Sequence, residues 1–361
     1  MTEITRRKGV AVQAKRLGFF TRLLDQAGAA ERYKLATEQI VHAERCGFDS
    51  AWVAQHHFDE SEGGLPAPLV FLATLATQTR RIRLGTGVIT LPLEHPIRVA
   101  EDVAVLDTLL GGRLEVGVGT GGTPSSFAAF GQDSARRATI FADHLRTLIG
   151  ALKGEAIAGT ANRLYPDARR LVDRMWQATF SANGGRRAGL DGHGLMLSRT
   201  QPRKVEAPTA SLADLQHPII DAYLAALPAG RTPRIAASRS LFVADNRKDA
   251  LRFAEQGLRR TLDRFRSSGH IIRGDTLDDL IATFDVHVGT PEDVIASLGA
   301  DTILPRVTDL VFQVHSVDPP PALILRSIRL TAERVAPALG WAGHTFSKQE
   351  AGTAARKSLA E

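Results

Sequence analysis

Short apolar segments alternate with segments of helical periodicity along almost the whole chain of 361 residues. Each apolar segment has the length of a strand, and each is followed by apolar residues at helical spacing. Regular alternation of strands and helices predicts a parallel sheet with the helices packed outside it. The eight segments that we interpret as strands are 16–20, 50–54, 82–90, 113–122, 175–182, 194–198, 234–244 and 309–315.

Eight strand–helix units with no composition break between them favour one closed (β/α)8 TIM barrel of class α/β over an open doubly wound sheet. We expect a single barrel domain over residues 1–345 and a flexible polar tail over 346–361. Two segments, 156–173 and 269–288, lack the alternation and are expected to be irregular insertions in the βα-loops. In this fold the βα-loops gather at the C-terminal ends of the strands and carry the active site.

The composition is that of a globular protein, with 43% hydrophobic and 23% charged residues. No apolar run approaches the roughly 18 residues of a membrane span, and the basic N-terminus lacks the apolar region of a signal peptide. The net charge of +6 is scattered without a basic stripe or a reader motif, which argues against nucleic-acid binding. The single cysteine, Cys46, cannot form an internal disulfide, so we expect a reducing, cytoplasmic location.

Two adjacent histidines, His56 and His57, follow the second predicted strand in the segment WVAQHHFDE. Neighbouring side chains on extended backbone point to opposite sides, so the pair is poorly arranged to hold one metal ion, and we expect no metal. Two interpretations remain open. The imidazoles can satisfy backbone groups of a loop, or one of them can position a ligand or transfer a proton. The position after a barrel strand favours a site histidine.

Three glycine-rich segments follow predicted strands. In FSANGGRRAGLD (180–191) a helix starts at small polar residues and two glycines, where N–H groups and the helix dipole favour an anion. The same pattern also fits a capped turn with arginines on an exposed helix face. In GTGVITLP (85–92) and GVGTGG (117–122), backbone without side chains can lie flat against a planar ligand, or can simply form bends at strand ends.

Taken together, these segments resemble the bacterial luciferase-like family of flavin-dependent monooxygenases. The resemblance lies in GFDSAWVAQHHFDE, LGTGVITLPLEHPIRVAEDVAVLDTLLGGRLEVGVGTG, FSANGGRRAGLDGHGLMLS and VHVGTPEDVIASL, which occur in the order of the family. It implies a barrel that binds reduced FMN, or in some branches the deazaflavin F420, at its C-terminal face. The implied activity is FMN-dependent oxygenation of a small organic substrate, with FMNH2 supplied by a separate flavin reductase.

The resemblance also implies residue roles. His56 matches the first histidine of a family motif near the flavin that does acid–base work. Ser181 and the backbone around Gly184 match the phosphate loop, and Gly87–Val88 matches a cis peptide bond under the isoalloxazine ring. The implied cofactor-binding residues are Thr86, Gly87, Val88, Thr120, Ser181, Asn183, Gly184 and Gly185.

Two positions depart from bacterial luciferase. Gln55 stands where that protein has Glu, and Thr120 stands where it has an Arg on the phosphate. The missing charge can come from Arg186 or Arg187, or helix N–H groups and hydroxyls can hold the phosphate without it.

The implied chemistry needs a proton-transfer group with a pKa near neutrality and a cover that excludes water. Segments 156–173 and 269–288 are the candidate covers. An F420-dependent hydride-transfer enzyme and a non-catalytic flavin-binding relative remain as alternatives, and we expect a homodimer.

Overall fold

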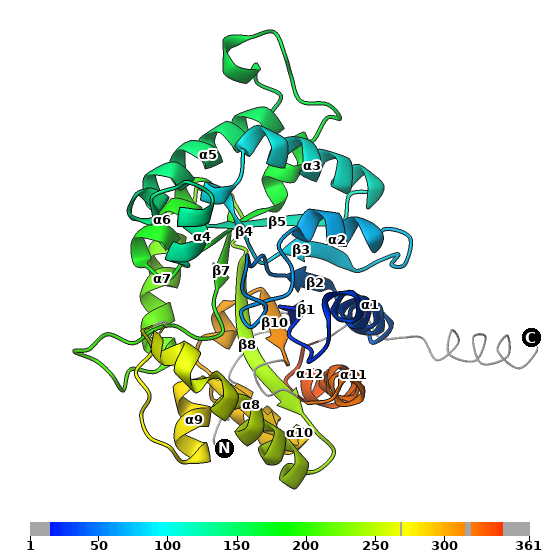
Figure 1. Cartoon of the computed structure of the whole chain (residues 1–361), viewed down its shortest axis with the longest axis vertical. Coiled ribbons are helices and arrows are strands. Elements are labelled where there is room, and N and C mark those ends of the chain that lie inside the picture. The colour runs from blue at the N-terminus through cyan, green and yellow to red at the C-terminus, as the bar shows by residue number, and fades with distance from the viewer. Residues whose placement is uncertain (1–14, 268, 315–318, 342–361) are drawn as a thin grey trace, which may run out of the picture.

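The computed structural model describes residues 15–267, 269–314 and 319–341. Its ten strands form one sheet in which every pairing is parallel (Figure 1). The strands are β1 (Arg16–Thr21), β2 (Ser50–Val53), β3 (Arg83–Thr86), β4 (Ile89–Thr90), β5 (Leu114–Gly119), β6 (Met175–Ala178), β7 (Gly194–Leu197), β8 (Ile235–Val243), β9 (Val286–Gly289) and β10 (Asp309–Gln313).

Eight of these strands close into a barrel in the order β1, β2, β3, β5, β6, β7, β8 and β10. Strand β10 closes the ring because it pairs with β1, at Phe312 opposite Phe19, and with β8, at Val311 opposite Ser238. Strand β4 continues β3 after a bend and pairs with the end of β5. The predicted (β/α)8 barrel is confirmed.

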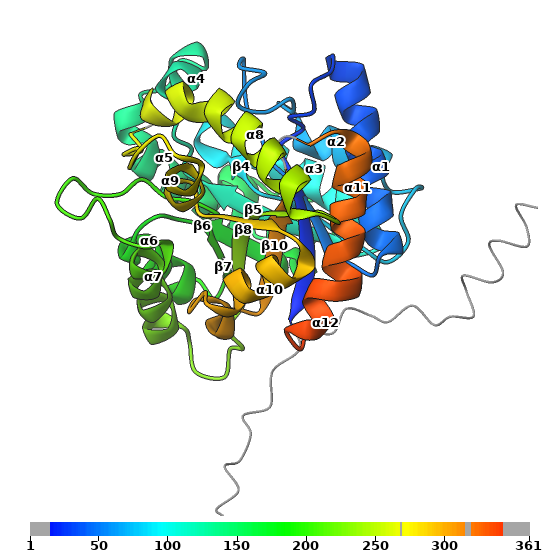
Figure 2. The same cartoon turned by 90° about the horizontal axis from the view of Figure 1, so that it is seen from below.

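The helices follow the strands and cover the outside of the barrel, and α1 and α11 lie side by side there (Figure 2). Several begin at signals present in the sequence, such as the capping box of Thr290 and Asp293 at the start of α10. The helices are α1 (Ala29–Arg45), α2 (Pro68–Thr74), α3 (Pro96–Leu109), α4 (Pro124–Ala129), α5 (Arg137–Leu152), α6 (Ala182–Leu190), α7 (Leu212–Ala226), α8 (Arg247–Ser267), α9 (Leu277–Thr283), α10 (Pro291–Gly299), α11 (Pro321–Leu330) and α12 (Ala336–Ala338).

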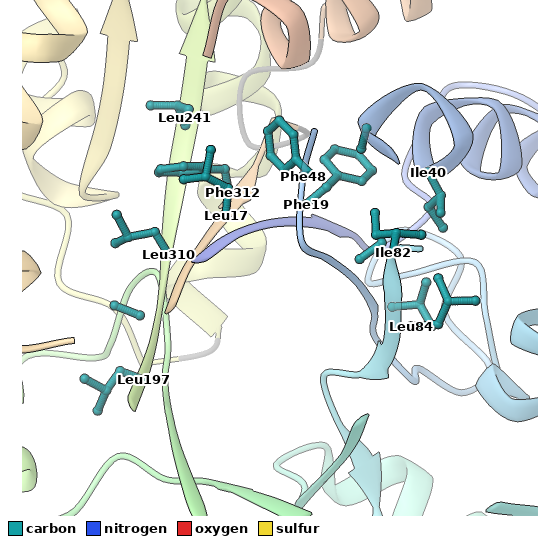
Figure 3. Packing of buried hydrophobic residues seen from close by; sticks show 14 of the residues in the cluster. Leu17, Phe19, Ile40, Phe48, Ile82, Leu84, Leu197, Leu241, Leu310 and Phe312 are labelled. Atoms are coloured by element: carbon teal, nitrogen blue, oxygen red, sulfur yellow. The ribbon is translucent and has the colours of Figure 1, made fainter. Parts of the chain in front are cut away.

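The main hydrophobic core lies between the strands and the helices. Successive side chains of a strand point to opposite faces, so residues such as Leu17 and Phe19 of β1 point outward and pack in this core with Ile40 of α1 (Figure 3). Leu310 and Phe312 of β10 do the same beside them. The alternate residues of each strand point into the barrel.

The inside of the barrel is filled by two tryptophan side chains. Trp52 of β2 and Trp176 of β6 are each 1% exposed, and their rings meet edge to face with centroids 5.7 Å apart. Neighbouring strands carry glycine at the same level. A Cβ atom on Gly85 would lie 2.3 Å from Cε3 of Trp52, and one on Gly194 would lie 2.2 Å from Cε3 of Trp176. The barrel is therefore a packed core and has no channel through it.

Below the tryptophans, charged side chains fill the N-terminal end of the barrel. Glu115 of β5 binds Arg83 through one carboxylate oxygen and accepts the indole N–H of Trp176 through the other, at 2.7 Å. Arg16 pairs with Asp309 at 2.8 Å on the other side of the barrel. With this end filled, the described residues leave the C-terminal end of the barrel open to a ligand.

The expectation that segment 156–173 is an insertion in a βα-loop is wrong. The segment connects α5 to β6, so it is an αβ-connection at the N-terminal ends of the strands. Arg174 donates to the carbonyl of Leu114 at the start of β5, and Asp173 pairs with Arg231, which precedes β8. A cover for the C-terminal end cannot come from here.

The expectation of an irregular segment over 269–288 is wrong in part. The segment contains the short helix α9 and the strand β9, which pairs with the C-terminal half of β8. A capping box of Thr276 and Asp279 starts α9, and this signal is present in the sequence. The predicted tail, 346–361, lies outside the described residues.

The tight contact between Gly85 and Trp52 predicts a stability effect. Gly85→Ala places a methyl group against a buried indole between two rigid strands, and should lower the free energy of unfolding by about 1–3 kcal/mol in urea denaturation. Gly122→Ala is the matched control, because no atom lies within 4 Å of its added Cβ. Equal stability of the two variants would contradict this packing.

Candidate functional site

A cavity of about 870 Å³ opens at the C-terminal ends of β2, β3, β5 and β6. Its volume lies in the range of small-molecule and cofactor sites. The lining residues include Ala54, Gln55, His56, His57, Glu62, Gly87, Val88, Thr90, Gly119, Thr120, Phe127, Arg137, Ala178, Thr179, Ser181, Asn183, Gly184 and Arg187.

The structure brings most of the predicted site residues together in this cavity, but Thr86 and Gly185 do not line it. Thr86 is fully buried, and its hydroxyl donates to the carbonyl of Gly117 at 2.9 Å and accepts the N–H of Gly117 at 3.0 Å. It therefore ties β3 to β5. Gly185 faces α7 instead, where an added Cβ would lie 2.5 Å from the carbonyl oxygen of Ile219.

One wall of the cavity is made of small residues. Gly87 and Val88 are joined by a cis peptide bond, which confirms the expectation from the family resemblance. Gly87 lies above the barrel interior, since a Cβ there would be 2.9 Å from the ring of Phe20. Ala54, Gly119 and Ala178 line the same cavity from the ends of β2, β5 and β6. This wall leaves space for a flat ligand.

Another part of the cavity lining is polar and is built on the start of α6. Ser181 caps this helix, with its side-chain oxygen accepting the N–H of Gly184 at 3.2 Å and its carbonyl accepting the N–H of Gly185 at 3.0 Å. The two glycine N–H groups are thus used within the helix. The N–H groups of Ala182 and Asn183 are the ones left at this helix start.

Two arginines bring positive charge to this polar part. Arg187 lines the cavity, donates to Gln177 at 3.0 Å and lies over the ring of Phe141 at 4.6 Å. Arg186 is exposed and does not line the cavity. Arg137, at the start of α5, lines it as well, and sequence reasoning missed this residue. Its segment carries no motif, so only the fold reveals its place.

His56 and Glu62 lie side by side and both line the cavity. The Nδ1 of His56 is 3.6 Å from a carboxylate oxygen of Glu62, and the backbone N–H of His56 donates to Leu65 at 3.0 Å. Burial is the main cause that lowers the pKa of His56 to about 4, and the charges of Arg22 and Arg264 add to this effect. The imidazole is therefore neutral at neutral pH and can accept a proton. The expected pKa near neutrality is not what this environment produces.

Its neighbours have structural contacts. Gln55 donates to Glu94 at 2.6 Å and accepts the N–H of Thr90 at 2.7 Å, so its amide fixes the loop after β3. The ring of His57 meets Phe130 edge to face at 4.9 Å, and its buried Nε2 has no hydrogen-bond partner among the described residues. Gln55, which stands where bacterial luciferase has Glu, thus holds this loop in place.

Within the described part of the chain, no cluster of three or more histidine, cysteine or acidic side chains could hold a metal ion. The same residues include no helix that is long and apolar enough to cross a membrane.

Comparison with known proteins defines the family. The profile of the luciferase-like monooxygenases matches residues 16–300. The chain belongs to this family. Among curated relatives, the 4-hydroxyprotoasukamycin monooxygenase of Streptomyces nodosus subsp. asukaensis is 35% identical over 218 residues, which are 57% of either protein. The chain spans between 25% and 57% of the length of eight curated relatives that it matches.

Solved structures share the fold and differ in cofactor. The oxygenating constituent of 3,6-diketocamphane monooxygenase from Pseudomonas putida, in complex with FMN, has a TM-score of 0.71 at 20% identity, over 90% of this chain and 99% of that one. The coenzyme F420-dependent tetrahydromethanopterin reductase from Methanopyrus kandleri has a TM-score of 0.64 at 18% identity, over 90% of this chain and 99% of that one. At these identities the likeness shows the fold.

The low pKa of His56 predicts a pH effect on stability. Unfolded chains take up a proton at the ordinary pKa of 6.5, and the folded protein does so only near 4, so the free energy of unfolding should fall as the pH drops from about 6.5 to 4. His56→Gln should make this fall smaller in thermal unfolding between pH 7.5 and 4.5, while His95→Gln, at an exposed helix start, should not. An unchanged pH profile in His56→Gln would contradict the pKa.

Proposed function

We propose that this protein is the oxygenating component of a two-component FMN-dependent monooxygenase, which receives FMNH2 from a separate flavin reductase and acts on a small organic substrate. The observation that carries the proposal is the mixed lining of the cavity. Its small residues, including Gly87 and Ala178, fit a planar ring system, and its polar part, with Ser181 and Arg187, fits a phosphate.

The residues of the polar part have defined tasks in this proposal. The Ser181 hydroxyl and the N–H groups of Ala182 and Asn183 would bind phosphate oxygens at the helix start, where the helix dipole favours an anion. Arg187, and Arg137 from α5, would supply the charge that Thr120 lacks. Reduced FMN supplies, when bound, the electrons that activate molecular oxygen.

His56 is the proposed proton-transfer residue. Its neutral imidazole lines the cavity near the small-residue wall and can accept a proton from a reacting group. Glu62, 3.6 Å away, would stabilise the imidazolium that results. Because the carboxylate lies on the Nδ1 side of the ring, Nε2 would serve the reacting group.

An F420-dependent hydride-transfer enzyme is the second candidate, because the fold is shared with an F420-dependent reductase. Mass spectrometry of the cofactor released from the native protein separates FMN from F420. Oxygen consumption with supplied FMNH2 and a screened substrate separates an oxygenase from a protein that only binds flavin.

The phosphate assignment predicts a selective loss of affinity. Arg187→Gln removes a charge at the proposed phosphate site and should weaken FMN binding by about tenfold or more, measured by flavin fluorescence, with little change for riboflavin, which has no phosphate. Arg186→Gln is the matched control, since this neighbouring arginine is exposed and off the cavity. Equal losses for both flavins in Arg187→Gln would refute the assignment. Gly184→Val is a poor test, because its side chain would strike Thr179.

The role of His56 predicts a loss of turnover. His56→Ala should lower turnover with supplied FMNH2 by about 10²–10⁴. FMN affinity should change little, because the proposed phosphate contacts come from other elements. The exposed His95 provides the control, and His95→Ala should keep the rate. A normal rate in His56→Ala would rule out proton transfer by this residue.

A further inference from the structure

A second cavity, of about 300 Å³, lies at the C-terminal ends of β1, β7 and β10. Five arginines line it, together with the apolar side chains of Leu258, Phe265 and Phe284. The arginines come from four separate parts of the chain: Arg22, Arg32, Arg199, Arg260 and Arg264. Such a concentration of guanidinium groups in one cavity is costly unless an anion is present.

Arg22 follows directly after β1 and is the best evidence for an absent partner. Its Nη2 donates to the carbonyl of Glu62, but its buried Nε has no hydrogen-bond partner among the described residues. Burial, together with the charges of Arg199 and Arg264, lowers its pKa well below the usual value. A buried N–H donor without an acceptor destabilises the protein, and an oxyanion would satisfy it.

Arg199 follows β7 on the other side of the same cavity. Its Nε donates to Gln313 at 3.1 Å, and its pKa is lowered to about 10 by burial first and by the charge of Arg264 second. The charge of Arg199 therefore acts on Arg22 within the same cavity. The planar guanidinium groups have the geometry that binds a carboxylate, sulfonate or phosphonate through two parallel hydrogen bonds.

A purely structural explanation is that these arginines hold the loop after β2 in place. Arg32, Arg264 and Arg22 do donate to the carbonyls of residues 60, 61 and 62 in turn. One carbonyl uses one of the five donors of a guanidinium, and Arg199 donates to none of these three carbonyls. Loop anchoring thus accounts for part of the cluster only.

Asp59 and Glu62 act on Arg22 and Arg264, but the five arginines that line the cavity outnumber these two carboxylates. Among the described residues the lining includes one carboxylate, Glu60, which is exposed and therefore solvated. Asp285, which acts on Arg199, is already held by Arg203 through both carboxylate oxygens. Glu62 lies against His56 on the side of the larger cavity.

The segment 60–62 lies between the two cavities, since Glu60 and Ser61 line the smaller one and Glu62 lines the larger. The charges of Arg22 and Arg264 reach His56 and act on its pKa. A ligand held by these arginines would therefore lie close to the proposed proton-transfer residue. The polar start of α6 in the larger cavity lies beside β5 and β6, which do not border the smaller cavity.

We infer that the arginine-lined cavity binds an oxyanion group of the substrate, a carboxylate, sulfonate or phosphonate, and so directs an acidic organic substrate toward His56. Only the direction of the substrate toward His56 rests on the proposed function, because anion binding itself requires no flavin. The apolar lining by Leu258 and Phe265 would contact the carbon skeleton next to the charged group.

Titration calorimetry on the full-length, flavin-free chain tests the inference with benzoate, benzenesulfonate and phenylphosphonate, and with the neutral benzamide. At least one of the three acids should bind, benzamide should not, and the tightest acid identifies the anion class. Arg199→Gln should weaken that acid by about tenfold or more, and so should Arg264→Gln, which provides a second variant if the first is poorly folded. Arg252→Gln, an exposed arginine on the same helix α8 as Arg264, should leave the affinity unchanged.

Three results would overturn the inference. The first is that none of the acids binds, or that benzamide binds as tightly as they do. The second is that Arg252→Gln weakens binding as much as Arg199→Gln and Arg264→Gln, because the effect is then one of general charge. The third is that the acid displaces FMN, or that Arg199→Gln weakens FMN but not riboflavin, because the arginines are then the flavin phosphate site. Failure of the flavin proposal would appear separately, as absence of FMN binding with acid binding intact.

Discussion

The packing of two indole rings inside the barrel is the constraint on which the rest of the structure depends. Trp52 and Trp176 fill the middle of the barrel only because Gly85 and Gly194 carry no side chains at that level. The charged residues below them, centred on Glu115, close the N-terminal end and hold one indole by its N–H. In the part of the chain that the structure describes, a ligand can therefore reach the barrel from the C-terminal ends of the strands, where both cavities lie.

The loop after β2 connects the chemistry of the two cavities. It carries His56 on one side and the carbonyls of residues 60–62 on the other. Arginines from α1, from α8 and from the position after β1 donate to those carbonyls. The position of the imidazole thus depends on contacts made far from it in sequence. Burial by these elements, and the positive charges that they bring, keep the histidine neutral.

The repeating pattern predicted the fold because a strand–helix alternation of this length has few other solutions, and the family resemblance placed His56, Val88 and Ser181 at one cavity. The sequence could not show which glycines face a ligand and which are needed for packing. Gly185 packs against α7, and Gly184 packs against Thr179. Arg137 and Arg22 lie outside any motif, and only the closure of the barrel brings them to a site. Segment 156–173 was misplaced because irregular sequence does not reveal to which end of a barrel it belongs.

The indole layer also sets the depth of the pocket floor, with Phe20 and Met196 beside Gly87 just above it. Directed evolution toward larger substrates therefore cannot deepen this pocket by shortening a tryptophan. Such a substitution leaves a void beneath the floor and lowers the free energy of unfolding by about 3–5 kcal/mol. A larger pocket has to be made by substitutions in the loops around its entrance. Mutant libraries confined to those loops would change the substrate range and leave the hydrophobic core intact.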